Sequence, residues 1–291
     1  MPQSDNLRGA LFMAAAMAAF TINDMIMKLV TQDLPLFQAI TMRGAITVVA
    51  LGIMVTTMAQ GRFRMARHDG RIVGLRAVAE VAATFTFIAA LMHMPLANLS
   101  AILQSLPLLV TLAAAVFFGD RIGWRRMTAI GIGFIGVLFI IRPGTDGFDI
   151  WSLVGLASVA TVVVRDLATR RLSPGIPSVT VAFWTSILLT ITAALMSVWE
   201  GWIMPQTLTL ILIPAAAVGV IIGYLTIIRA MRVGDLGFVA PYRYTALLWA
   251  IVLGYLVFGD FPDEWTLLGS AIVVATGIFT IWRESKVRAG R

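Results

Sequence analysis

Ten long apolar stretches constrain the fold of this chain more than any other feature. They cover approximately residues 9–30, 35–58, 72–92, 96–118, 124–142, 151–168, 178–199, 208–230, 236–258 and 266–283. A helix rises about 1.5 Å per residue, so about twenty apolar residues cross the hydrocarbon core of a bilayer. The chain is 59% hydrophobic and only 13% charged, whereas soluble domains are about a quarter charged. We therefore predict an all-α polytopic membrane protein with ten transmembrane helices in a lipid bilayer.

Charge alternates between successive connections. One set carries Arg8, Arg62, Arg64, Arg67, Arg71, Arg121, Arg125, Arg126, Arg170, Arg171, Arg229, Arg232, Arg283, Lys286, Arg288 and Arg291. The other set carries Asp33, Asp146, Asp149, Glu200, Asp260, Asp263 and Glu264. Because basic connections stay in the cytoplasm, this pattern predicts that both termini are cytoplasmic. It also accounts for the net charge of +7 without a nucleic-acid partner.

The sequence repeats itself once. The repeat aligns Phe118-Gly119-Asp120 with Phe258-Gly259-Asp260, Trp124 with Trp265, Gly136 with Gly277 and Arg142 with Arg283, and more weakly Asp24 with Asp166 and Lys28 with Arg170. Chance similarity among apolar helices is the alternative. Since each half has five spans, the second half enters the membrane from the opposite side, as in transporters built from inverted repeats. We predict a cytoplasmic segment 1–8, a first repeat 9–142, a second repeat 151–283 and a cytoplasmic tail 284–291.

Several motifs resemble the EamA type of the drug/metabolite transporter superfamily over essentially the whole chain. They are Asn23-Asp24 with Lys28, Phe118-Gly119-Asp120-Arg121, Gly133-Phe134-Ile135-Gly136, Arg142-Pro143, Ala240-Pro241-Tyr242-Arg243-Tyr244 and Phe258-Gly259-Asp260-Phe261-Pro262. The bacterial S-adenosylmethionine transporters of this superfamily share the Pro-Tyr-Arg-Tyr run, and its bacterial riboflavin transporters are also similar. The resemblance implies two EamA repeats around a central cavity in a bacterial inner membrane, and it leaves the substrate open.

Arg243 lies between Tyr242 and Tyr244 inside the ninth apolar stretch. If this span begins near Gly237, the Arg243 backbone lies about 9 Å below the membrane surface, where a bare cation costs on the order of 3 kcal/mol. Snorkelling of the side chain to the headgroups is the alternative. Pro241 removes a backbone hydrogen bond nearby, and the tyrosines offer hydroxyl groups. We therefore expect Tyr242, Arg243 and Tyr244 to line a site.

Two further charged pairs are expected within the membrane. Asp24 and Arg43 lie at similar distances from the turn that joins the first two helices, so they can meet. Asp24 also has Lys28 one turn later, which makes a structural ion pair an alternative to substrate contact. Glu80 is expected at the depth of Arg243 in the other half, and a pair between them would act as a gate; the alternative is a bond to Arg76 on its own helix.

Other basic and aromatic residues have simpler interpretations. Lys28, Arg76, Arg142 and Arg165 lie near helix ends, where snorkelling explains them. Trp184 and Trp249 fall inside helices, where they either pack against neighbours or offer a stacking face in the cavity. Gln104 could bind substrate or a neighbouring helix. The candidates for the substrate cavity are Asp24, Arg43, Glu80, Gln104, Trp184, Tyr242, Arg243, Tyr244 and Trp249.

Some chemistry is absent from the sequence. There is no glycine-rich phosphate loop with its lysine, which argues against ATP as the energy source. With no cysteine and only two histidines, we expect no metal site and no cofactor. We expect no catalytic residues, although an intramembrane enzyme using Glu80 or Asp24 is the opposing class. The glycines at 131, 133, 136, 219 and 223 fit helix packing within the chain more simply than a homodimer.

The predicted function is secondary transport of a small organic metabolite by alternating access. Basic residues outnumber acids inside the membrane, which favours neutral, zwitterionic or anionic cargo. Interior aromatic residues favour a planar ring, so we expect riboflavin first and S-adenosylmethionine second, with export of amino acids or other metabolites as a further alternative. Direction of transport and proton coupling are left open.

Overall fold

The computed structural model describes residues 3–119, 123–143, 149–173, 175–233 and 236–289. These ranges fold into helices and contain no strand, which confirms the predicted all-α class. Asp120, Arg121, Asp146 and Arg291, which the charge and repeat arguments used, lie outside the described residues.

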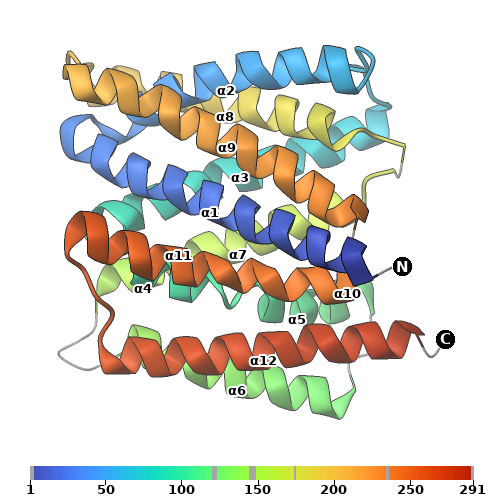
Figure 1. The fold of residues 1–291 in the computed structure, drawn as a ribbon. Coiled ribbons are helices and arrows are strands. Elements are labelled where there is room, and N and C mark those ends of the chain that lie inside the picture. Colours follow the sequence, from blue (N-terminus) through green and yellow to red (C-terminus); the bar gives the residue numbers. More distant parts are fainter. Residues whose placement is uncertain (1–2, 120–122, 144–148, 174, 234–235, 290–291) are drawn as a thin grey trace.

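The helices form one bundle (Figure 1). In order they are α1 (Gln3–Asp33), α2 (Leu36–Met58), α3 (Arg67–His93), α4 (Leu96–Leu103), α5 (Leu106–Phe118), α6 (Trp124–Ile141), α7 (Ile150–Arg170), α8 (Ser178–Glu200), α9 (Thr207–Val233), α10 (Leu236–Val239), η1 (Ala240–Tyr244), α11 (Thr245–Leu253), η2 (Gly254–Phe258) and α12 (Glu264–Ala289). Both termini lie at the right-hand end of the bundle in Figure 1. We call this the terminal end, and the opposite end the far end.

Ten segments of the described chain are long and apolar enough to cross a membrane. Eight of them are single helices. The fourth combines α4 and α5, and the ninth combines η1, α11 and η2 over Ala240–Phe258. The number of spans agrees with the sequence prediction, and the structure adds that two of them are interrupted.

A proline lies at the break in the fourth span and at the 3-10 segment of the ninth span. Pro107 lies in the first turn of α5, and a proline ring clashes with the carbonyl four residues earlier, which here belongs to Leu103, the last residue of α4. Pro241 occupies the start of η1, a 3-10 segment. The interruptions fall in the fourth span and the ninth span, which are equivalent positions of the two halves. In transporters with inverted repeats, such paired breaks mark the binding site.

Helix packing follows the same two-fold relation. Exchanging the halves turns the contact of α1 with α9 into that of α7 with α3, and both contacts are extensive. The contact of α2 with α9 likewise corresponds to that of α8 with α3, while α2 with α8 and α6 with α12 correspond to themselves. Because each half has five spans, α7 starts at the far end while α1 starts at the terminal end. The described chain is therefore an inverted repeat.

Two cation–aromatic contacts repeat this relation at opposite ends. Lys28 lies 4.9 Å from the centre of the Phe258 ring, and Arg170 lies 4.8 Å from the centre of the Phe118 ring. The glycine after each phenylalanine ends its helix with a positive φ, 69° at Gly119 and 72° at Gly259, where a residue with a side chain would be strained. These contacts support the weak alignment of Lys28 with Arg170.

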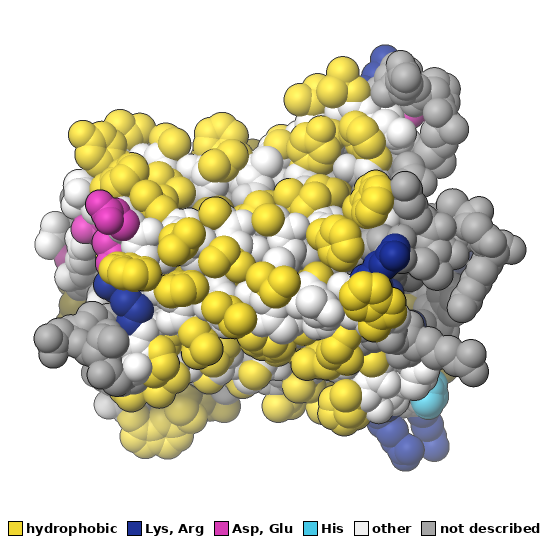
Figure 2. Space-filling view, turned by 90° about the horizontal axis from the view of Figure 1, so that it is seen from below, with side chains coloured by type: hydrophobic (Ala, Val, Ile, Leu, Met, Phe, Trp, Pro, Cys, Tyr) yellow, Lys and Arg dark blue, Asp and Glu magenta, His cyan; other side chains and the backbone are white. Residues whose placement is uncertain are grey.

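The fifth and tenth spans, α6 and α12, pack closely on one side of the bundle (Figure 1). A Cβ added to Gly136 would lie 2.8 Å from the backbone oxygen of Gly269, so glycine permits the close approach. Seen from this side, hydrophobic side chains cover the middle of the surface and charged side chains gather toward its ends (Figure 2). This distribution suits a surface that faces lipid.

We expect Gly136→Ala to lower the melting temperature of the purified protein in detergent, because its methyl group would force α6 and α12 apart at a cost of about 1–3 kcal/mol. Gly131→Ala is the matched control on the same helix, since nothing lies within 4 Å of an added Cβ there. Equal melting temperatures for the two variants would contradict the packing.

Candidate functional site

A central cavity of about 470 Å³ lies between the two halves. It is lined by α1, α2, α3 and α4 of the first half and by α7, α8, α9 and η1 of the second half. These are spans one to four and their repeat equivalents six to nine, whereas α6 and α12 contribute none of its described lining. A cavity of this size is in the range that holds a small organic ligand.

The cavity wall carries an unusual number of charges for a membrane interior. Its basic residues are Arg43, Arg76, Arg165 and Arg243, and its acids are Asp24, Glu80 and Asp166. The lining also includes Phe20, Phe87 and Tyr224, and Phe20 meets Tyr224 edge to face at 5.8 Å between ring centres. The chamber therefore offers charges, hydroxyl groups and rings to a bound solute.

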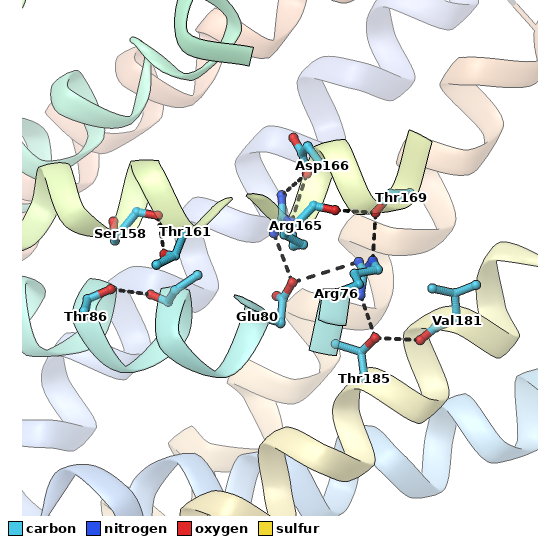
Figure 3. A network of polar contacts seen from close by, with 11 residues as sticks. Arg76, Glu80, Thr86, Ser158, Thr161, Arg165, Asp166, Thr169, Val181 and Thr185 are labelled. Atoms are coloured by element: carbon cyan, nitrogen blue, oxygen red, sulfur yellow. Dashed lines mark hydrogen bonds and ion pairs between the residues drawn. The ribbon is translucent and has the colours of Figure 1, made fainter. Parts of the chain in front are cut away.

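A polar network around Glu80 joins the two halves (Figure 3). One Glu80 oxygen lies 3.2 Å from Arg165 on α7 and 3.9 Å from Arg76 on its own helix. Arg165 also bonds Asp166 at 2.9 Å. Since α3 belongs to the first half and α7 to the second, the Glu80–Arg165 pair is an ion pair between the repeats.

Arg76 extends the network to a third helix. Its guanidinium donates to Thr169 on α7 at 3.0 Å and to Thr185 on α8 at 2.6 Å (Figure 3). The expectation that Arg76 and Arg165 snorkel to the headgroups is therefore wrong, because both find partners inside the bundle.

The expected pair of Glu80 with Arg243 does not form in this structure. The alternative bond to Arg76 is present, and the partner in the other half is Arg165 instead. The expected depth of Glu80 in the membrane correctly predicted a partner in the second half. Depth alone does not tell which of several cations at a similar level faces the Glu80 carboxylate.

Asp24 and Arg43 meet indirectly through Asn23. The Asn23 amide donates to Asp24 at 2.9 Å and its oxygen accepts from Arg43 at 3.1 Å. Lys28 does not pair with Asp24 as the one-turn spacing suggested. Its ammonium donates to the backbone oxygen of Met94 at 2.8 Å and lies 3.8 Å from Asp260.

Arg243 lines the cavity without a fixed partner. Its side chain is exposed to this space, and within the described part of the chain it makes neither a hydrogen bond nor an ion pair. The acid with the main electrostatic influence on it is Asp166, which is already bonded to Arg165.

The other expected candidates lie outside the cavity. Tyr244 is 5% exposed, its hydroxyl has no hydrogen-bond partner, and its ring lies where a Cβ on Gly277 would have to be. Tyr242 packs beside Phe238, with 5.9 Å between ring centres. Gln104 is buried at the break between α4 and α5, where Leu103 reaches the cavity in its place.

Neither interior tryptophan faces the chamber. Trp184 and Trp249 are 41% and 40% exposed and are absent from the described lining. Trp184 donates its ring N–H to the backbone oxygen of Phe63 at 2.9 Å. The sequence left open whether these rings pack against neighbours or face the cavity, because a position along a helix does not define its face.

Several lining residues were missed as site candidates, among them Arg76, Arg165, Asp166 and Tyr224. The repeat held a usable signal for two of them. Asp166 aligns with Asp24, and Arg165 therefore aligns with Asn23. Asp24, Arg165 and Asp166 line the chamber, and Asn23 bonds Asp24 and Arg43. No simple pattern in the sequence marks Tyr224.

The far end is closed by contacts between the halves. Glu200 of α8 accepts from the backbone N–H groups of Leu36 and Phe37 at 2.9 and 2.7 Å. Asp33 accepts from the hydroxyl of Thr209 at 2.5 Å. The cavity, in contrast, reaches Thr169, next to the last residue of α7 at the terminal end.

A metal site would need several ligating side chains in one place. Among the described residues no group of three or more histidine, cysteine, aspartate or glutamate side chains has suitable geometry.

Comparison with known proteins identifies the family. The model of the EamA-like transporter family matches residues 7–142 and again 149–283. A solved crystal structure superposes with a TM-score of 0.61 at 20% identity, covering 91% of this chain and 97% of that chain, which supports the fold alone.

Three relatives have named functions. The S-adenosylmethionine uptake transporter of Rickettsia conorii is 25% identical over 66% of this chain and 65% of its own length. The riboflavin transporter of Vibrio cholerae is 30% identical over 66% of this chain and 64% of its own length. The pseudopaline exporter CntI of Pseudomonas aeruginosa is 25% identical over 93% of this chain and 94% of its own length. The first two matches thus span just under two thirds of those relatives.

Because the family model covers both halves of the ten-span bundle, the chain belongs to the EamA-like transporter family and is a multi-pass membrane protein.

Proposed function

We propose that the protein moves a small organic metabolite across a bacterial inner membrane by alternating access, without ATP. The observation that carries this proposal is the charged cavity between two inverted halves. An inverted repeat supplies two conformations of similar energy, because exchanging the roles of the halves opens the opposite end.

This structure represents the state in which the cavity is reached from the terminal end. At the far end, Glu200 accepts from a backbone N–H of the first half, and Asp33 accepts from a hydroxyl of the second half. These contacts close that end, whereas the cavity lining extends to Thr169 at the terminal end. If both termini are cytoplasmic, as the distribution of basic residues predicts, this is the conformation that faces the cytoplasm.

The proposed substrate is a metabolite that can interact with the charged side chains and the few aromatic rings of the cavity lining. The argument for riboflavin as first choice depended on Trp184, Trp249, Tyr242 and Tyr244, which lie outside the cavity. S-adenosylmethionine, whose transporters are among the relatives, bears both a ring and ionic groups. We therefore propose S-adenosylmethionine ahead of riboflavin as the first solute to test.

We expect proteoliposomes containing the protein to take up radiolabelled S-adenosylmethionine or riboflavin saturably and faster than empty liposomes. Gly131→Ala should behave like the wild type, since its added methyl group meets nothing. Chromatography of the vesicle contents should recover the solute unchanged. Formation of a product without net movement of intact solute would support the opposing enzyme class and contradict the transporter proposal.

The orientation can be tested with single cysteines, because the natural chain has none. We expect Met204→Cys at the far end, where the side chain is 88% exposed, to react with an impermeant maleimide on intact cells from which the outer membrane has been removed. Arg64→Cys, exposed at the terminal end, should react only after the inner membrane is permeabilised. The reverse order would place both termini outside.

The ion pair between the repeats should control turnover. Glu80→Gln removes the charge that Arg165 and Arg76 share across the cavity, and a change of only about 1.4 kcal/mol in the barrier alters a rate tenfold. We expect transport to fall at least about tenfold, with normal protein levels in the membrane. Glu264→Gln, an exposed acid outside the cavity, is the control. Wild-type transport by Glu80→Gln would reduce the pair to a passive contact.

A further inference from the structure

We propose that Arg243 is the binding site for a carboxylate group of the transported solute. This inference deepens the proposed function and rests on it, because it names the chemical class that the cavity selects. It starts from the three other cavity arginines, which already have partners. Arg76 bonds two hydroxyl groups and Glu80, Arg165 bonds two acids, and Arg43 bonds Asn23.

Arg243 is the exception among these four. Its side chain opens into the cavity and bonds no other side chain or backbone group in the described chain. Asp166, the acid that acts on it, is held by Arg165 at 2.9 Å. A guanidinium within the membrane requires either a partner or water, and the cavity supplies room for both.

The charge balance of the cavity points the same way. Four arginines face three acids, so one positive charge is left when the fixed pairs are counted. A solute that places one negative group beside Arg243 would neutralise this excess. A carboxylate fits best, because its two oxygens match the planar fork of the guanidinium with two parallel hydrogen bonds.

The position of Arg243 suits a group that is held in place to meet the solute. It lies in η1, the interrupted part of the ninth span, rather than in a continuous helix. Its neighbours Tyr242 and Tyr244 pack into the protein and so fix the segment on either side. Of these three residues only Arg243 is presented to the chamber.

The test uses a cysteine placed in the same part of the cavity and two thiol reagents that differ in charge. Ile227 lines the cavity and belongs to the apolar cluster that contains Tyr242, so Ile227→Cys reports on the surroundings of η1. The purified protein in detergent is treated with carboxyethyl methanethiosulfonate or with the neutral hydroxyethyl reagent. The measured quantity is the ratio of the two labelling rates.

We expect this ratio to fall about tenfold when Arg243→Gln is added, because a charge-assisted hydrogen bond to the carboxylate is lost. Arg243→Lys should retain part of the preference, since it keeps the charge and loses the fork. Arg43→Gln removes the same charge from the cavity but from an arginine already bonded to Asn23, so it should lower the ratio less than about threefold. Size-exclusion chromatography establishes that each variant is folded.

Three results would overturn the inference: a ratio unchanged by Arg243→Gln, an equal fall with Arg43→Gln, or a cysteine that neither reagent reaches. The measurement needs no transport, so it separates the two proposals. Dependence on Arg243 without solute movement in proteoliposomes would remove the proposed function alone. Solute movement with labelling indifferent to Arg243 would remove only the carboxylate site.

Discussion

The cost of placing ionised groups in a bilayer organises this structure. An arginine or a carboxylate that faced acyl chains would lose several kcal/mol of hydration free energy, about 3 kcal/mol on the most lenient scale. The chain avoids that cost by turning seven charged side chains toward one chamber and by bonding most of them to each other, as Glu80 does with Arg165. The outer face keeps apolar side chains in the middle and charges at its ends (Figure 2).

The inverted repeat places the chamber between two halves of the same architecture. Spans one to four and six to nine surround it, while α6 and α12 pack against each other to one side. Glycine at 136 lets that outer pair approach closely, and the inner spans surround the chamber. The two broken spans contribute Leu103 and Arg243 to the cavity, so the prolines that interrupt them shape the site directly.

The charged residues of the cavity differ in whether they have a bonding partner. Arg76, Arg165 and Glu80 are held by contacts that cross between the halves. Arg243 has no such contact in the described chain, and in our proposal it binds the solute. A transporter needs both kinds of charge, since the solute must change the balance between two conformations to be carried.

Much of the fold could be predicted from residues alone. Apolar length predicts ten spans, Phe118-Gly119 and Phe258-Gly259 predict the repeat, and Pro241 predicts where the ninth span is disturbed. The site was harder. Asp24, Arg43, Glu80 and Arg243 do line the cavity, because a charge inside a span has few other places to go.

The positions of aromatic and amide residues within the spans did not predict which of them face the cavity. Trp184, Trp249, Tyr242, Tyr244 and Gln104 all lie outside the cavity. A ring is stable against lipid, against a neighbouring helix or in a chamber, so its presence within a span does not select among them.

The sequence by itself determined the membrane class, the number of spans, the inverted order of the halves and the need of the deep charges for polar surroundings. Each of these follows from length, composition or the cost of a charge, which are properties of a single segment. Only the tertiary structure decided which cation meets Glu80, that Asn23 stands between Asp24 and Arg43, and that Arg243 lines the cavity without a hydrogen bond or ion pair in the described chain. Those outcomes depend on the rotation of each helix about its axis, and that rotation is set by contacts among several helices at once.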